Sequence, residues 1–307
     1  MEIRNKRILV TGAHGFLGSF VAKELEQRGA IVIKLDKGED LTKESCVEKY
    51  RSTDIDCLIH LAGYNGGIAF NQKYPFDIFE KNTIMSMNAL KIAIESGARK
   101  FLGVLTSCGY PPDNGDNIFE ETYLDDKPHE SISSHGYAKR NLLIACQMAN
   151  RQYGINAVCL VPNTIYGPGD TIDPVRTKVM MAMVKRFVDA KNEDSHYVEC
   201  WGTGSPVREF IYVEDVAKLI VDSIGSYSDV QSPLNLSTGQ YCTIKELAET
   251  VAREVGYVGE IRWDSTKPDG QMQKVLNTDK MRSIFTDFCP TDLNHGIKKT
   301  IEWYNSK

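Results

Sequence analysis

Two adjoining segments decide the fold class: the apolar run Arg7-Ile8-Leu9-Val10 and the glycine-rich segment Gly12-Ala13-His14-Gly15-Phe16-Leu17-Gly18. A short apolar run is typical of a parallel strand buried on both faces. Beyond the glycines, apolar residues recur at helical spacing up to Leu25. The GxxGxxG spacing allows a tight turn and lets a diphosphate approach the helix N-terminus, where free N–H groups favour negative charge. Glycines also serve ordinary turns, but this position between a strand and a helix favours a dinucleotide site.

Strands and helices continue to alternate up to about residue 165. The expected strands are Ile31–Leu35, Cys57–Leu61, Phe101–Leu105 and Asn156–Val161. The expected helices are Asn82–Ser96, closed by Gly97, and Ala138–Tyr153, closed by Gly154. This alternation predicts an α/β protein with a Rossmann-type, doubly wound parallel sheet.

The pattern changes after Tyr166-Gly167-Pro168. A helix is expected at Lys178–Lys191, and the strand Phe210–Val213, the helix Glu214–Ser223 and the strand Leu234–Leu236 are expected to return to the first sheet. Thr243, with Glu246 three residues on, predicts a capping box before a helix. We therefore expect a dinucleotide-binding domain of residues 1–165 plus about 209–238. A smaller C-terminal α/β substrate domain would comprise about 166–208 plus 239–307.

Composition excludes several classes of protein. The 307 residues are 42% hydrophobic and 25% charged, with a formal net charge of −5. These values exclude a disulfide mini-protein, a fibrous repeat and a disordered chain. The acidic balance argues against a nucleic-acid partner, and no apolar stretch predicts a membrane span or a signal peptide. The eight cysteines lack paired spacing, which favours a cytoplasmic protein without a metal site.

Asp36 follows the second expected strand, roughly 20 residues beyond the glycines. A carboxylate there binds ribose hydroxyls and repels a 2′-phosphate, which favours NAD(H). His14, Lys34 and Lys37 can offset that repulsion and admit NADP(H), so both cofactors remain open. Ala62-Gly63, after the third strand, would let the backbone pass close to the cofactor.

Several motifs together resemble the extended short-chain dehydrogenases/reductases, and more specifically the GDP-L-fucose synthase family, whose members are NADPH-dependent epimerase/reductases. The motifs are His60-Leu61-Ala62-Gly63, Asn65-Gly66-Gly67-Ile68, Thr106-Ser107-Cys108-Gly109-Tyr110-Pro111, Pro162-Asn163-Thr164-Ile165-Tyr166-Gly167-Pro168 and the run from Trp201 to Phe210. The resemblance covers about residues 6–224, and the Trp201–Phe210 run is its most specific part. With the glycine motif, it gives these expected cofactor-binding residues: Gly12, His14, Gly15, Phe16, Leu17, Gly18, Asp36, Lys37, Asp40, Leu41, Leu61, Ala62, Gly63, Lys139 and Pro162.

The resemblance implies a Ser/Thr–Tyr–Lys catalytic set. Thr106 occupies the Ser/Thr position and Lys139 the lysine position, but the tyrosine position is His135. Tyr137 is close in sequence, yet residues two apart on a helix point about 200° apart. An imidazole can donate a proton, and its ordinary pKa near neutrality suits that task. Three interpretations stand: His135 is the working acid, the chain has reduced activity, or the register differs.

The family also inverts carbons beside the ketone with a cysteine and a histidine. Cys108 matches the cysteine, while the histidine position is Lys178. A lysine acts as the acid only if burial lowers its pKa, and it can instead bind phosphate. The reductase half is therefore better supported than the epimerase half.

Substrate recognition follows from the same resemblance. Arg208 would pair with the diphosphate of a sugar nucleotide, because guanidinium is a forked and permanently charged donor. Trp201 would border the base or, alternatively, belong to the core. The remaining expected substrate-binding residues are Asn65, Gly66, Cys108, Asn163, Lys178 and Lys185.

The leading hypothesis is an enzyme that reduces the 4-keto group of a nucleotide-diphospho-deoxy sugar, GDP-linked in preference, with or without epimerisation at C3 and C5. One alternative is a sugar-nucleotide sensor without turnover, which His135 favours. Another is an epimerase or dehydratase that recycles NAD, which Asp36 favours. The resemblance also implies a homodimer formed through two long helices.

Overall fold

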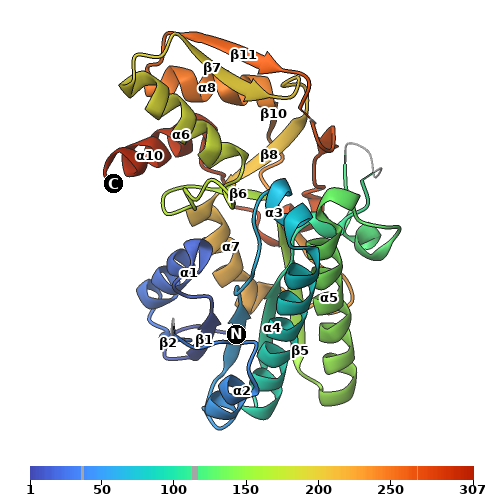
Figure 1. Ribbon diagram of the computed structural model, residues 1–307. Coiled ribbons are helices and arrows are strands. Elements are labelled where there is room, and N and C mark those ends of the chain that lie inside the picture. Colours follow the sequence, from blue (N-terminus) through green and yellow to red (C-terminus); the bar gives the residue numbers. More distant parts are fainter. Residues whose placement is uncertain (36–37, 113–116, 268) are drawn as a thin grey trace.

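A computed structural model describes residues 1–35, 38–112, 117–267 and 269–307. Its main layer is a six-stranded sheet in the order β2-β1-β3-β4-β5-β9, with every neighbouring pair parallel (Figure 1). The strands are β1 (Arg7–Thr11), β2 (Ile31–Lys34), β3 (Cys57–His60), β4 (Lys100–Val104), β5 (Asn156–Pro162) and β9 (Leu234–Leu236). This order confirms the expected doubly wound fold.

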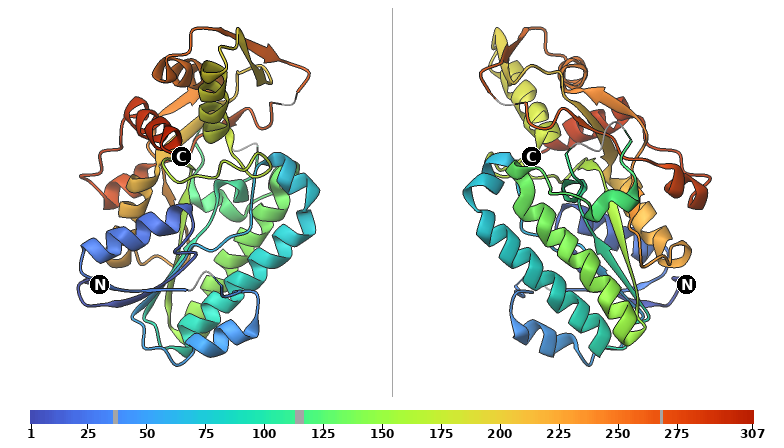
Figure 2. Two further views of the ribbon diagram at one scale, coloured as in Figure 1. Left: turned by 60° about the vertical axis from the view of Figure 1, so that its left-hand side comes forward. Right: turned by 90° about the vertical axis from the view of Figure 1, so that its right-hand side faces the viewer.

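Helices cover both faces of this sheet (Figure 2). Ile8 and Val10 of β1 join the core beneath α1 and α7, whereas Leu9 joins the core beneath α4 and α5. Both faces are therefore apolar, which explains why β1 reads as a continuous hydrophobic run. The helices are α1 (Phe16–Gln27), α2 (Glu44–Tyr50), α3 (Ile68–Lys73), α4 (Pro75–Glu95), α5 (Ser133–Tyr153) and α7 (Val213–Ser226).

The two long helices begin earlier than the sequence pattern predicts. Pro75 occupies the first turn of α4, where its fixed φ and missing N–H cost nothing. Helix α5 starts at Ser133 and ends at Tyr153, and Gly154, whose φ is +71°, caps it. The longer α5 places His135 in its first turn, at the carboxyl end of the sheet.

Most of the remaining elements form a smaller layer with a core of its own. Strand β8 (Val207–Tyr212) pairs with β6 (Thr164–Tyr166), β10 (Tyr241–Thr243) and β12 (Gln273–Lys274). The expectation that the strand around Phe210 rejoins the first sheet is therefore wrong, although α7 and β9 do return there. The domain boundaries given above stay a prediction. The other elements are β7 (Tyr197–Trp201), β11 (Glu260–Asp264), α6 (Val179–Asn192), α8 (Ile244–Val255), α9 (Asp279–Ile284), α10 (Leu293–Asn305) and the 3₁₀ turns η1 (Ser107–Gly109), η2 (Glu120–Leu124) and η3 (Glu130–Ile132).

The capping box expected at Thr243 is present: its hydroxyl accepts from Glu246 N–H, and the Glu246 carboxylate accepts from Thr243 N–H. It begins α8, which packs with α6 and α10 around the second core (Figure 1). No helix among the described residues is both long and apolar enough to cross a membrane.

Candidate active site

The glycine-rich turn after β1 forms a cradle of closely packed backbone. Gly12 has a φ of +70°, and a Cβ on it would lie 2.8 Å from Ala62 N. A Cβ on Gly18 would overlap the Gly12 carbonyl oxygen. Gly15 precedes α1 and supplies no side-chain cap, so the N–H groups of the first turn remain available to an anion. The cradle therefore fits the diphosphate of a dinucleotide.

A buried hydrogen-bond network, which the sequence analysis missed, fixes the backbone of Leu61 and Ala62 on the other side of this cradle. The Thr11 hydroxyl oxygen accepts from the N–H groups of Leu61 and Ala62, 3.2 Å away in each case, and lies 2.8 Å from His60 Nδ1. Burial lowers the pKa of His60 well below its ordinary value. A neutral His60 thus pins the backbone that faces Gly12. The only sequence signal was a histidine inside an apolar strand.

The remaining expected cofactor residues that the structure describes lie around the carboxyl ends of β1, β2 and β5. His14 is exposed on the glycine turn. Leu41 is buried, and the carboxylate of the preceding Asp40 accepts a hydrogen bond from Thr42 N–H at 2.9 Å. Pro162 ends β5 and pairs with Leu236. Asp36 and Lys37 lie outside the described residues, so their expected roles stay predictions, as do those of Phe16 and Leu17.

Helix α5 presents His135 and Lys139, one turn apart, on its buried face. Tyr137 points the other way and is 38% exposed, as the helical angle predicts. The Lys139 ammonium donates to the carbonyl oxygen of Val104, at the end of β4, over 2.7 Å. Burial lowers the pKa of Lys139 to about 8.

Thr106 and Cys108 follow β4 and lie against the same end of α5. A Cβ on Gly136 would lie only 2.6 Å from the Cys108 carbonyl oxygen, so glycine permits this approach. The Thr106 hydroxyl oxygen accepts from Cys108 N–H at 3.3 Å. The fold therefore brings Thr106, Cys108, His135 and Lys139 together.

His135 is buried, and its Nδ1 lies 2.9 Å from the amide nitrogen of Asn65. Burial first, and then the positive charges of Lys139, Lys178 and Lys274, lower its pKa well below the ordinary value. The expectation that the pKa of His135 lies near neutrality is therefore wrong, because it neglected desolvation. At neutral pH the ring is uncharged.

Cys108 has a cationic neighbour that the sequence analysis missed. The Lys274 ammonium lies 3.6 Å from Cys108 Sγ. Burial raises the pKa of Cys108, but Lys274, the Thr106 hydroxyl and Lys178 outweigh it, so the net pKa is lowered. Lys274 lies in β12, opposite Arg208 in β8, and no local motif marks it.

The expected substrate residues lie toward the smaller layer. Arg208 is partly buried, and its guanidinium donates to the carbonyl oxygens of Val207 and Gln271. Burial lowers the pKa of Arg208. Trp201 is 62% exposed on β7, so the alternative of a core aromatic is wrong. Lys178 precedes α6 and is exposed, so the burial that an acid role requires is absent.

The similarity of this chain to known proteins agrees with this geometry. The model of the NAD dependent epimerase/dehydratase family matches residues 8–237. The chain belongs to this family. GDP-L-fucose synthase 1 of Arabidopsis thaliana is 34% identical over 99% of this chain and 94% of its own length. GDP-L-fucose synthase of Escherichia coli (strain K12) is 30% identical over 97% of this chain and 96% of its own.

Solved structures agree with this assignment of the epimerase/dehydratase fold. A GDP-6-OMe-4-keto-L-xylo-heptose reductase from C. jejuni has a TM-score of 0.90 at 25% identity, covering 100% of this chain and 99% of that one. A GDP-L-fucose synthetase from Naegleria fowleri, bound to NADP, has a TM-score of 0.90 at 24% identity, covering 99% and 95%. The resemblance inferred from the motifs is thus confirmed.

Two expected substrate residues of this epimerase/dehydratase lie elsewhere. Asn163 is buried, and its amide nitrogen donates to the Glu209 carboxylate over 2.5 Å. Its amide oxygen accepts from Thr164 N–H, so the side chain has a structural role and does not line an open site. The Lys185 ammonium pairs with Asp189 on α6 over 2.6 Å. Neither residue contacts the catalytic group.

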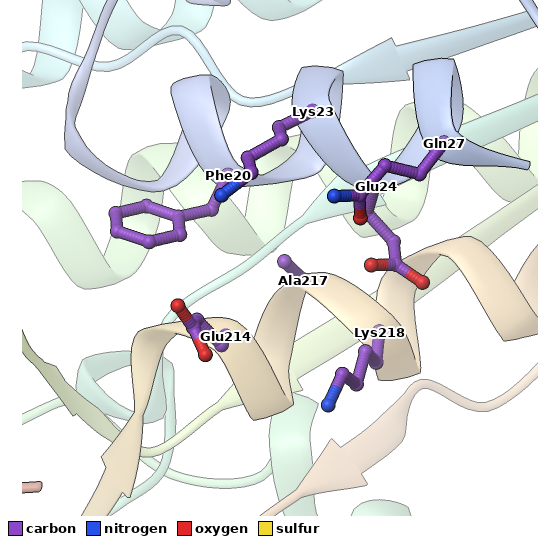
Figure 3. A pocket seen from close by; sticks show the side chains of 7 residues that line it. All are labelled: Phe20, Lys23, Glu24, Gln27, Glu214, Ala217 and Lys218. Atoms are coloured by element: carbon purple, nitrogen blue, oxygen red, sulfur yellow. The ribbon is translucent and has the colours of Figure 1, made fainter.

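A depression between α1 and α7 is also separate from the site. Its walls are mainly charged and polar, among them Lys23, Glu24 and Lys218 (Figure 3). None of the expected catalytic residues lines it. Among the described residues, no group of three or more His, Cys, Asp or Glu side chains is placed to hold a metal ion.

Proposed function

We propose that this chain uses NADP(H) to reduce the 4-keto group of a GDP-linked deoxy sugar. The observation that carries the proposal is the placement of His135 and Lys139 on the buried face of α5, against Thr106 and beside the glycine cradle. The near full-length similarity to GDP-L-fucose synthases supports the GDP-sugar as the substrate class.

Each residue has a role that its contacts allow. The backbone of Gly12, Gly15 and Gly18 would hold the diphosphate of the dinucleotide, and Lys139 would hold its nicotinamide ribose. When bound, the reduced dinucleotide supplies the hydride that the ketone carbon receives. Thr106 and His135 hold the ketone oxygen by hydrogen bonds from the hydroxyl and from the ring N–H. Arg208 and Trp201 bind the GDP portion.

We extend the proposal to epimerisation at C3 and C5, the carbons beside the ketone. Cys108 is the base, because a thiolate next to Lys274 removes a proton that the neighbouring ketone acidifies. The exposed Lys178 helps to lower the pKa of Cys108 and binds phosphate, while water returns the proton to the carbon. In D₂O without NADPH, the wild-type protein should exchange deuterium into the keto sugar, and Cys108→Ser should not.

The reductase proposal is tested by mixing the protein, NADPH and GDP-4-keto-6-deoxy-mannose. Loss of absorbance at the nicotinamide band is the expected result. If neither the wild-type protein nor His135→Tyr oxidises NADPH, the proposal is wrong. The same assay with NADH, compared at equal concentration, decides the cofactor preference that Asp36 and Lys37 leave open.

A second candidate function is a sugar-nucleotide sensor, and the histidine at the tyrosine position favours it. Binding of GDP-sugar without turnover would support the sensor, provided that His135→Tyr is also inactive. A large gain of rate in His135→Tyr would instead identify a weakened catalyst. Tightly retained NAD with no net consumption of added NADPH would support the epimerase/dehydratase alternative.

The chain is further proposed to form a homodimer in the cytoplasm. Helices α4 and α5 lie side by side at the surface (Figure 2) and expose Phe76 and Ile84 from one helix and Ile144 and Met148 from the other. A second copy of the same face would bury these side chains. Light scattering should give a dimer for the wild-type protein and a monomer for Ile144→Asp/Met148→Asp. All eight cysteines are unpaired, which fits a reducing compartment.

A further inference from the structure

Asn71 has a fixed orientation because of the backbone around it. Its amide nitrogen lies 3.0 Å from the carbonyl oxygen of Gly66 and 3.1 Å from that of Gly67. Both are acceptors only, so a flipped Asn71 would place oxygen against two oxygens. The NH₂ group must therefore face them. Asn71 is almost fully buried, which makes such a flip costly.

Asn71 in turn fixes Asn65. The same amide nitrogen donates to Asn65 Oδ1 over 3.0 Å. The carbonyl oxygen of Asn65 also accepts from Arg176 Nε and Nη2, at 3.1 and 3.0 Å, so its backbone is held as well. With its oxygen committed to Asn71, Asn65 can only present its NH₂ group on the other side.

That NH₂ group faces His135 Nδ1 at 2.9 Å. A ring nitrogen that receives a hydrogen bond carries no proton, so the proton of the neutral ring lies on Nε2. The charged groups that act on this ring are Lys139 of α5, Lys178 before α6 and Lys274 of β12, all cations, with Cys108 packed against the neighbouring Gly136. The three ammonium groups all disfavour an imidazolium.

We propose that His135 serves this reaction as a neutral hydrogen-bond donor through Nε2–H, and that Asn71 and Asn65 are positioning residues that hold it in that tautomer. The inference rests on the proposed function. Reduction leaves negative charge on the ketone oxygen, which Nε2–H and the Thr106 hydroxyl stabilise, and water then supplies the proton that completes the alcohol. His135 therefore replaces the phenol of the family as an oxyanion donor and not as an acid.

The tautomer is measured directly in the protein without substrate. Nitrogen NMR of ring-labelled histidine, with His135→Gln to assign the signal, should show Nδ1 unprotonated and Nε2 protonated between about pH 6 and 8. An imidazolium at pH 6.5, or a proton on Nδ1, overturns the proposal. This readout does not depend on turnover.

Kinetics of two Asn65 variants test the relay, by which we mean the hydrogen bonds from Asn71 to Asn65 and from Asn65 to His135. Asn65→Asp replaces the donor by a carboxylate, which accepts from Nδ1–H and stabilises the imidazolium. We expect kcat to fall about 10-fold or more with an unchanged KM for NADPH, and the NMR signal to move to the protonated ring. Asn65→Ala should lower kcat while leaving the ring neutral. An Asn65→Asp enzyme within two-fold of wild type, with an unchanged ring, would refute the relay.

Failure of this inference is distinguishable from failure of the proposed function. A wild-type protein that binds GDP-sugar, shows the Nε2–H tautomer and, like His135→Tyr, oxidises no NADPH would refute the proposed reduction and support the relay. A wild-type protein that reduces the sugar while His135 is an imidazolium would refute the relay and support the proposed reduction.

Discussion

The ammonium of Lys274 lies 3.6 Å from the sulfur of Cys108, although 166 residues separate them in the chain. One belongs to the strand β12 of the smaller layer and the other to the turn after β4 of the main sheet. The pair therefore joins the two layers at the candidate site. It also explains why a partly buried thiol has a lowered pKa, since an adjacent positive charge stabilises the thiolate.

Lys274→Met should make Cys108 less acidic. Removal of the ammonium leaves burial to raise the pKa of the thiol, so the thiolate fraction at neutral pH falls. We expect alkylation of Cys108 by iodoacetamide to slow about 10-fold, the effect of one pKa unit. Peptide mass spectrometry separates Cys108 from the exposed Cys289. Lys298→Met, on the surface of α10, is the matched control, and equal alkylation rates in the two variants would contradict the assignment.

Lys139 should make the free energy of unfolding depend on pH in the alkaline range. Burial lowers its pKa from 10.5 to about 8, so between these values the unfolded chain binds the proton and the folded chain does not. The free energy of unfolding therefore rises from pH 8 to pH 10.5. Below pH 8 the full cost of the buried charge, on the order of 3 kcal/mol, is present.

Lys139→Met should then be more stable than wild type at pH 7, because the cost of the buried charge is removed. The gain should be only about 1–2 kcal/mol, because the Val104 carbonyl oxygen also loses its donor. Urea denaturation at several pH values measures this effect, and NADPH oxidation should be lost. Lys100→Met is the matched control. Burial also lowers the pKa of Lys100 to about 8, but Lys100 lies at the other end of β4, so its removal should stabilise the protein and preserve activity.

Gly18→Ala should destroy the dinucleotide cradle. The added methyl group overlaps the Gly12 carbonyl oxygen, so the turn must move away from α1. We expect loss of NADPH binding in isothermal titration and a destabilisation of about 1–3 kcal/mol. Gly38→Ala, whose Cβ meets no atom within 4 Å, should leave the unfolding free energy nearly unchanged. Tight NADPH binding by Gly18→Ala would show that the cofactor binds elsewhere.

Trp201→Ala should weaken binding of the GDP-sugar without unfolding the protein. The ring is 62% exposed, so its loss removes little packing, whereas stacking on a nucleobase contributes about 1–3 kcal/mol. The KM for the sugar nucleotide should rise about 10-fold, with an unchanged melting temperature. Tyr153→Ala replaces an aromatic that is 57% exposed at the far end of α5 and should leave this KM unchanged.

Local patterns in the chain were sufficient to predict the parallel sheet, the glycine-rich turn and the shared helical face of His135 and Lys139. These features are local: apolar periodicity defines β1 and α1, glycine spacing defines the turn, and residues four apart on one helix must share a face. His135 and Lys139 could therefore be paired, and Tyr137 set aside, without coordinates.

The chemistry open to these residues depends on contacts that form only in the folded chain. The protonation state of His135 depends on burial and on Lys178 and Lys274, which lie far away in sequence. Its tautomer depends on Asn65 and Asn71, which precede it by 70 and 64 residues and hold it through successive amide hydrogen bonds. The sheet to which β8 belongs is likewise set by long-range pairing. Desolvation and hydrogen-bond direction arise from contacts between distant segments, and no local pattern in the chain encodes them.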